Sequence, residues 1–154
     1  MTETTNGNGS EKDKCTFICS RDTLDGAFPS LILGINAARM GMDSTIFYTF
    51  MGINVIRKGQ AGKCRFIPPG VMGAIPGMSN VATRMMGQKM DKANIPCLEE
   101  LLEMAQMEGV RLVACKMTMD MMEFKADDFI DGVIIENAEE YLKHAKDCKI
   151  NLFT

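Results

Sequence analysis

Apolar and polar positions along this chain predict short strands separated by helices. Five runs are rich in residues favoured in sheets, and six further segments have apolar residues at helical spacing or helix-capping residues at their ends. The predicted strands are Lys14–Ser20, Ser44–Phe50, Arg111–Cys115, Gly132–Ile135 and Lys149–Phe153. The predicted helices are Leu24–Met40, Gly52–Lys58, Met78–Met90, Ile95–Glu108, Thr118–Phe124 and Asn137–Cys148. Because the two kinds of element alternate, we expect an α/β fold with a parallel sheet covered by helices on both faces.

Two stretches lie outside this pattern. Residues 1–13 hold almost no apolar side chains, so we expect a flexible tail followed by a single domain over residues 14–154. Gly59–Gly77 contains five glycines and three prolines, which indicates a long irregular connection. Long loops of this kind often serve function, and this one is a candidate lid or docking surface.

Charge and composition exclude several classes of partner. Seventeen basic and twenty acidic residues give a net charge of −3, too weak and of the wrong sign to hold nucleic acid. The most apolar stretch, Phe66–Ala82, is broken by prolines and glycines and is too short to span a membrane. The first residues do not form a basic start followed by an apolar run, so no secretory signal is predicted. We therefore expect a cytoplasmic protein whose six cysteines are reduced.

Cys115 is the sharpest chemical feature of the sequence. It ends a predicted buried strand and precedes a predicted short helix, and open parallel sheets bind their ligands at that edge. A thiol at a helix N-terminus is stabilised as the thiolate, and Lys116 adds a positive charge beside it. The alternative is that Cys115 is only the last apolar residue of a core strand, since buried cysteines are commonly inert.

Cys19 and Cys64 are secondary candidates. Cys19 stands at the end of the first predicted strand and before a helix, so it could line the same crevice, or pack in the core together with Cys15. Cys64 lies between Lys63 and Arg65, a setting that we expect to be exposed, electropositive and favourable to a thiolate.

Metal and cofactor sites are not predicted. The sequence has no C-x-x-C pair, and its single histidine, His144, is expected to be a solvated helix residue. GQAGKC at Gly59–Cys64 does not meet the P-loop pattern, and GVMGAIPG at Gly70–Gly77 does not meet the dinucleotide-binding one. The methionines around the long loop and after Cys115 could coordinate Cu(I), but we favour an adaptable apolar wall or a subunit contact.

The chain resembles the DsrE/DsrF-like family. Within that family it looks most like the larger, Met-rich subgroup. The likeness rests on CTFICSRDTLDGAFPSLILGINAARMGMDSTIFYTFMG, PCLEELLEMAQMEGVRLVACKMTMDMM and DGVIIENAEEYLKHA, with ACKMTMDMM as the subgroup's pattern. The resemblance implies a three-layer α/β/α sandwich with a five-stranded, mainly parallel sheet, and assembly into trimers or hexamers. It also implies that a strand-end cysteine, Cys115 here, receives sulfane sulfur as a persulfide and passes it to a partner.

The hypothesis that follows is a sulfur-relay protein, or sulfurtransferase, that works with sulfur donor or acceptor proteins of the carrier or rhodanese type. Cys115 is its predicted catalytic residue, and Lys116, Met117 and Met119 are the predicted binding residues beside it. One alternative is a non-catalytic module that binds a small ligand or a partner in a Met-lined crevice. Another is a structural subunit of a sulfur-transfer complex.

Overall fold

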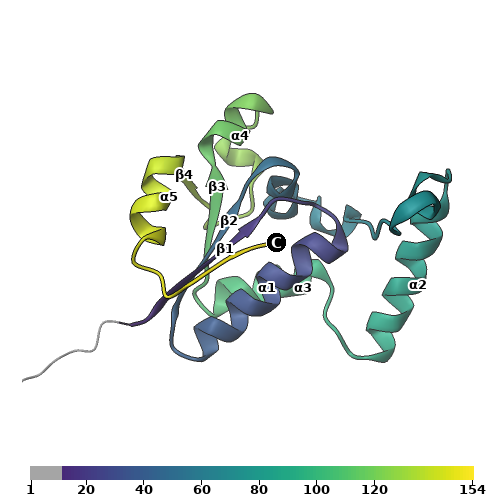
Figure 1. The fold of residues 1–154 in the computed structure, drawn as a ribbon, viewed down its shortest axis with the longest axis horizontal. Helices are drawn as coiled ribbons and strands as arrows, with labels where there is room; N and C mark the ends of the chain where they lie inside the picture. The colour runs from purple at the N-terminus through teal and green to yellow at the C-terminus, as the bar shows by residue number, and fades with distance from the viewer. Residues whose placement is uncertain (1–11) are drawn as a thin grey trace, which may run out of the picture.

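A five-stranded parallel sheet forms the centre of the computed structural model, which describes residues 12–154 (Figure 1). The strand order is β4-β3-β2-β1-β5, and every pair of neighbours is parallel. The strands are β1 Lys14–Cys19, β2 Asp43–Tyr48, β3 Arg111–Cys115, β4 Ile134–Glu136 and β5 Ile150–Phe153. All five predicted strands are present, and the expected α/β fold with a parallel sheet is confirmed.

Helices cover both faces of this sheet. Helices α1 (Leu24–Arg39) and α3 (Leu98–Met107) pack on one face and enclose the larger apolar core, while α5 (Ala138–Ala145) covers the other face (Figure 1). The short helix α4 (Lys116–Met121) directly follows β3 at the carboxyl edge of the sheet. The three central strands are buried almost throughout, as expected for parallel strands covered on both sides.

Several element boundaries differ from the predicted ones. The second strand ends at Tyr48 because the chain turns at Phe50, whose φ is +46°, and a 3₁₀ helix, η1 (Phe50–Ile56), follows. Helix α3 begins three residues later than Ile95, because Cys97 is its N-cap and donates its N–H to the Glu100 carboxylate at 2.9 Å.

The chain between η1 and α3 contains the 3₁₀ helices η2 (Ala61–Lys63) and η3 (Gly70–Ala74) and the helix α2 (Met78–Lys92). Arg65 still pairs with Thr23 before α1, and the chain beyond it projects away from the sheet (Figure 1); we call residues 66–92 the arm. Neither η3 nor α2 has a buried residue. At the base of the arm, the Thr83 hydroxyl accepts the N–H of Phe66 at 2.9 Å.

The predicted flexible tail, residues 1–13, can be compared with the structure only at its last two residues. Of the expected flexible tail, residues 1–11 lie outside the described residues. Asp13, the last residue of that segment, already contacts the sheet: its carbonyl accepts the N–H of Asp43 at 2.8 Å, and its carboxylate pairs with Lys149 at 2.6 Å.

Candidate functional site

Cys115 is the last residue of β3 and also the N-cap of α4. Its backbone is extended, with φ −69° and ψ 115°, so the chain passes from strand to helix without a loop. At such a junction the first N–H groups of the helix have no partner inside the helix. The structure thus places this thiol at the carboxyl edge of a central strand, where parallel sheets bind ligands.

The Cys115 side chain lies on the α5 face of the sheet, in a small apolar cluster with Phe47, Val113, Tyr141 and Ala145. The rings of Phe47 and Tyr141 stack with their centroids 4.2 Å apart and form the centre of this cluster. Cys115 is only 4% exposed. A reagent therefore reaches its sulfur only after a neighbouring side chain or α4 moves.

Cys19 does not share this surface. It ends β1 as predicted, but its side chain belongs to the large core on the opposite face, beneath α1. Its thiol lies within hydrogen-bonding distance of the carbonyls of Arg21 (3.5 Å) and Gly26 (3.7 Å). Complete burial raises the pKa of Cys19, since desolvation penalises the thiolate. The structure does not bring Cys19 and Cys115 together.

The expectation of an exposed, electropositive Cys64 is wrong. Cys64 is buried in the large core at 8% exposure. Burial, with Asp22 as a further contribution, raises the pKa of its thiol to about 12. Lys63 and Arg65, its sequence neighbours, are exposed, whereas Cys64 packs into the core and borders a cavity that Asp22 also lines.

The three predicted binding residues have different surroundings. The Lys116 ammonium forms an ion pair with Asp120 one helical turn later, so its charge is shared with that carboxylate. Met117 is 66% exposed at the start of α4, whereas Met119 is buried in the core on the α1 side. Lys116 and Met117 are therefore open to an approaching partner, whereas Met119 is not.

The methionines predicted as one cluster lie in two separate places. Met72, Met78, Met85 and Met86 line a cavity of about 250 Å³ within the arm. Helix α4, which carries Met117, Met119 and Met121, lies at the carboxyl edge of the sheet, well apart from α2 (Figure 1). The structure therefore does not bring the two groups together as ligands of one ion.

The sequence analysis did not predict the polar layer that lies beneath α5. Arg111 on β3 pairs with Glu136 on β4 at 2.7 Å. His144 shares a hydrogen bond of 3.0 Å with Thr45, and partial burial lowers its pKa. His144, predicted as a solvated helix residue, lies on helix α5 but is only partly exposed. The signal that was available is the helical spacing of Tyr141 and Ala145, which places His144 toward the buried side of α5.

Thr118 is a second residue that the sequence analysis passed over. It is buried on α4, and its hydroxyl accepts the N–H of Phe50 at 3.1 Å and lies 3.2 Å from the hydroxyl of Thr49. These contacts attach the helix after Cys115 to the turn after β2.

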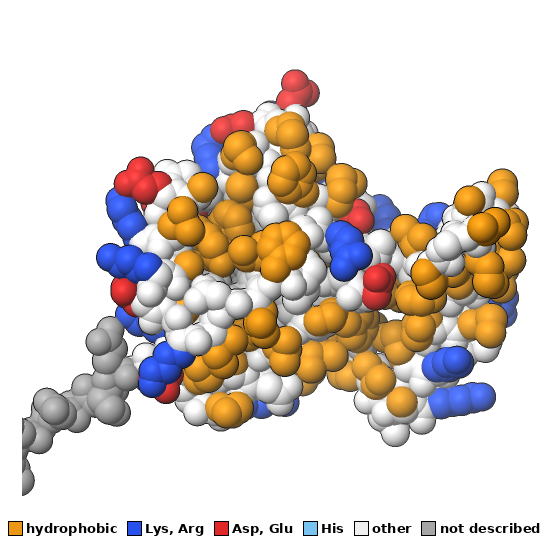
Figure 2. Space-filling view, in the orientation of Figure 1, with side chains coloured by type: hydrophobic (Ala, Val, Ile, Leu, Met, Phe, Trp, Pro, Cys, Tyr) orange, Lys and Arg blue, Asp and Glu red, His pale blue; other side chains and the backbone are white. Residues whose placement is uncertain are grey.

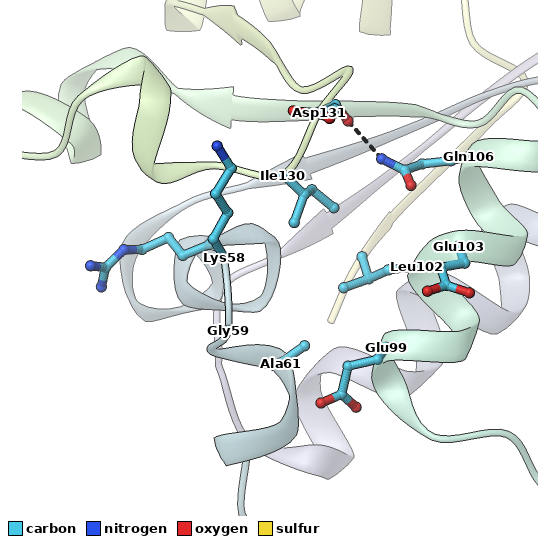
Figure 3. Close-up of a pocket in the computed structure, with 10 residues that line it drawn as sticks. Lys58, Gly59, Ala61, Glu99, Leu102, Glu103, Gln106, Ile130 and Asp131 are labelled. Carbon is cyan, nitrogen blue, oxygen red and sulfur yellow. Dashed lines mark hydrogen bonds between the residues drawn. The ribbon is translucent and has the colours of Figure 1, made fainter.

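A cavity of about 360 Å³ lies on the opposite face of the sheet from the Cys115 side chain (Figure 3). Arg57 and Lys58 line one side, and Glu99, Leu102 and Glu103 of α3 line the other. Gln106 spans its rim by donating to the carbonyl of Asp131 at 2.6 Å. None of the candidate cysteines lines this cavity.

Together these features define an α/β protein with a strand-end cysteine at the carboxyl edge of a parallel sheet. The chain belongs to the DsrE/DsrF/DrsH-like family, whose sequence pattern matches residues 11–153. It is 32% identical over 159 residues to a protein of Allochromatium vinosum named sulfur carrier protein DsrE2, covering 93% of this chain and 99% of that protein. It is also 32% identical over 153 residues to the uncharacterized protein YrkE of Bacillus subtilis, covering 91% and 96%.

Solved structures show the same fold. The crystal structure of the YchN protein from Escherichia coli superposes with a TM-score of 0.62 at 16% identity, covering 94% of this chain and 100% of that one. At this identity the likeness establishes the fold alone. In the described residues, no helix combines the length and apolar character needed to cross a membrane.

Proposed function

We propose that this protein carries sulfane sulfur as a persulfide on Cys115 and passes it to a thiol of an acceptor protein. The observation that carries the proposal is the place of Cys115, at the end of β3 and at the N-cap of α4. The relative named a sulfur carrier, 32% identical over nearly the whole chain, supports the same chemistry.

The reaction consists of two thiol exchanges. The Cys115 thiolate attacks the outer sulfur of a donor persulfide, R–S–SH; a new S–S bond forms, the donor's S–S bond breaks, and the donor leaves as the thiolate RS⁻. An acceptor thiolate then attacks the outer sulfur of Cys115–S–SH and releases the Cys115 thiolate. Sulfane sulfur moves without net oxidation or reduction, so no further reactant is needed.

The surroundings of Cys115 suit a carrier. The thiol makes no cap hydrogen bond in the resting structure, so the free N–H groups at the start of α4 are available to stabilise the anion formed in each step. The apolar cluster around Phe47 and Tyr141 shields the sulfur from water and from stray thiols between the two exchanges. Transfer then requires an opening of this cluster when a partner docks.

The proposal also defines the partners and the compartment. Donor and acceptor are sulfur-transfer proteins of the carrier or rhodanese type, because each must present a persulfide or a thiol to a buried sulfur. A carrier thiol must stay reduced between exchanges, and the cytoplasm keeps thiols reduced. All six cysteines are free in the structure.

Intact-mass analysis after incubation with a polysulfide donor tests this proposal. The reduced wild type should gain about one sulfur atom and lose it on reduction. Cys115→Ser should not gain it, whereas Cys97→Ser, which removes an exposed thiol, should behave as the wild type. An equal gain in Cys115→Ser would exclude Cys115 as the carrier.

The burial of Cys115 favours one alternative, a binding module in which this cysteine only packs. Alkylation by iodoacetamide separates the two functions. If a minor open state serves sulfur exchange, Cys115 is alkylated in native protein at a rate well above that of Cys19, which is fully buried. If Cys115 only packs, both are alkylated on global unfolding alone.

A further inference from the structure

We propose that the arm and helix α1 form a binding site for a free fatty acid. The site consists of two apolar cavities, one between the arm and α1 and one within the arm itself. The alkyl chain lies along both cavities, and the carboxylate lies beside Lys89. Cys115 lines neither cavity, so the site is separate from the proposed sulfur chemistry.

The cavity between the arm and α1 has a volume of about 240 Å³. Phe28 and Ile32 of α1 contribute to its lining, and so do Met86 and Met90 of α2. Figure 2 shows hydrophobic side chains where the arm meets the rest of the molecule. Each of these four residues is half-buried or exposed, although it faces apolar neighbours across the cavity. The arm and α1 therefore present apolar surface to each other without filling the space between them.

The cavity within the arm has a volume of about 250 Å³ and is lined by residues of α2 and of the loop before it. Phe66 and Met86 line both cavities, so the two spaces meet at these side chains. Together they form one elongated apolar space, within the range of about 300–1,000 Å³ that small-molecule sites occupy. Methionine side chains adapt their shape to a flexible apolar ligand such as an alkyl chain.

Two charged side chains set the head group of the ligand and its direction. Among the described residues, Lys89 is the only charged residue that lines the cavity within the arm, and Asp25 is the only one that lines the other. Asp25 lies in the first turn of α1, where the helix N-terminus already stabilises its carboxylate. The arm holds three basic residues and one acidic residue, so Lys89 lies in a cationic segment. A carboxylate head group is therefore attracted to Lys89 and repelled from Asp25.

The shape of the site selects a fatty acid among anionic amphiphiles. Two cavities that meet at one point hold a single extended chain, whereas a phospholipid carries two chains. Because each methylene removed from water strengthens binding, affinity should rise with chain length until both cavities are filled.

Isothermal titration calorimetry with sodium laurate, kept below its micelle-forming concentration, tests the site. Wild type should bind one laurate per chain. Octanoate has four fewer methylenes to bury, so it should bind at least about 10-fold more weakly. Dodecanol, which has the same tail length but no charge, reports on the apolar cavities alone.

Two lysine variants test the head group. Lys89→Glu and Lys92→Glu make the same change of charge on the same exposed side of the chain, but of the two residues only Lys89 lines a cavity. Lys89→Glu should raise the dissociation constant of laurate by about 5-fold or more and leave that of dodecanol unchanged. Lys92→Glu should bind both compounds within about 2-fold of wild type.

Two methionine variants test the tail. Met86→Asp places a charge where the cavities meet and should raise the dissociation constants of laurate and dodecanol alike, by at least about 10-fold. Met107→Asp, at the exposed end of α3, lines neither cavity and should bind both compounds as wild type does.

Several outcomes would overturn the proposal. A wild type that does not bind laurate would do so, and so would equal effects of the two lysine substitutions, which indicate adsorption to a charged surface. A Met86→Asp variant that binds laurate as wild type does would place the tail elsewhere. Tighter binding of dodecylammonium than of laurate would place the head group at Asp25 and exclude a fatty acid. Binding to phosphatidylcholine–phosphatidylglycerol vesicles without binding of laurate would assign the arm to a membrane surface instead.

Discussion

The backbone N–H of Phe50 donates a hydrogen bond to the buried hydroxyl of Thr118 at 3.1 Å. This contact connects two strand ends, because Phe50 lies just after β2 and Thr118 lies three residues after Cys115. The hydroxyl also lies 3.2 Å from that of Thr49, so one side chain of α4 satisfies two groups of the neighbouring turn. The helix that begins at the candidate thiol is therefore held in place by the turn that follows the neighbouring strand β2.

Replacing Thr118 by valine should destabilise the protein by about 1–3 kcal/mol, because the change keeps the shape but leaves the N–H of Phe50 without its partner. Thr23→Val is the matched control. The Thr23 hydroxyl is buried and has no hydrogen-bond partner among the described residues, so its loss should change the free energy of unfolding by less than about 0.5 kcal/mol. Urea unfolding of the two variants measures the difference. Equal destabilisation would contradict the role given to Thr118.

Phe50 adopts a left-handed backbone conformation, with φ +46°, and the residue is 54% exposed. Asparagine tolerates this conformation and a β-branched residue does not. Phe50→Val should therefore be less stable than Phe50→Asn by about 1–2 kcal/mol, although both remove the ring. Thermal and urea unfolding of the two variants measure this difference. A valine variant more stable than the asparagine variant would contradict a left-handed conformation at this position.

Cys64 should make the protein sensitive to alkaline pH. Its thiol has an ordinary pKa of 9.0 when unfolded and about 12 when folded, because burial penalises the thiolate. Above the unfolded value the unfolded chain loses a proton that the folded chain keeps, so stability is complete below pH 9.0 and declines as pH rises toward 12. The free energy of unfolding, followed across this range, should fall less steeply in Cys64→Ala than in wild type. Parallel slopes would contradict the assigned burial.

His144 should contribute a dependence on acid pH. Partial burial, together with Arg111, lowers the pKa of His144 below its ordinary 6.5. The unfolded chain therefore binds the proton first, and stability falls as pH drops below 6.5. Between about pH 7.5 and about pH 5.5, wild type should lose more stability than His144→Gln, which can keep the hydrogen bond to Thr45. An identical loss in both proteins would show that His144 does not titrate in this way.

Local sequence pattern was enough to locate most elements of the fold. All five strands and the long helices α1, α2, α3 and α5 were predicted within a few residues of their observed ends, because apolar periodicity and capping residues act over one or two turns. The position of Cys115 at a strand-to-helix junction follows from the same short-range signals. Local pattern also identified Cys19 as a strand end.

The surroundings of these residues depended on tertiary structure. Cys19 and Cys115 both end strands, yet their side chains lie on opposite faces, because a shift of one residue turns every side chain to the other side of the sheet. Cys64 is flanked by two charged residues in sequence, but a non-local core encloses it. The sequence by itself determined the order of elements and the candidate thiol. Only packing between distant segments decided which thiols are enclosed and which surfaces are left for a partner.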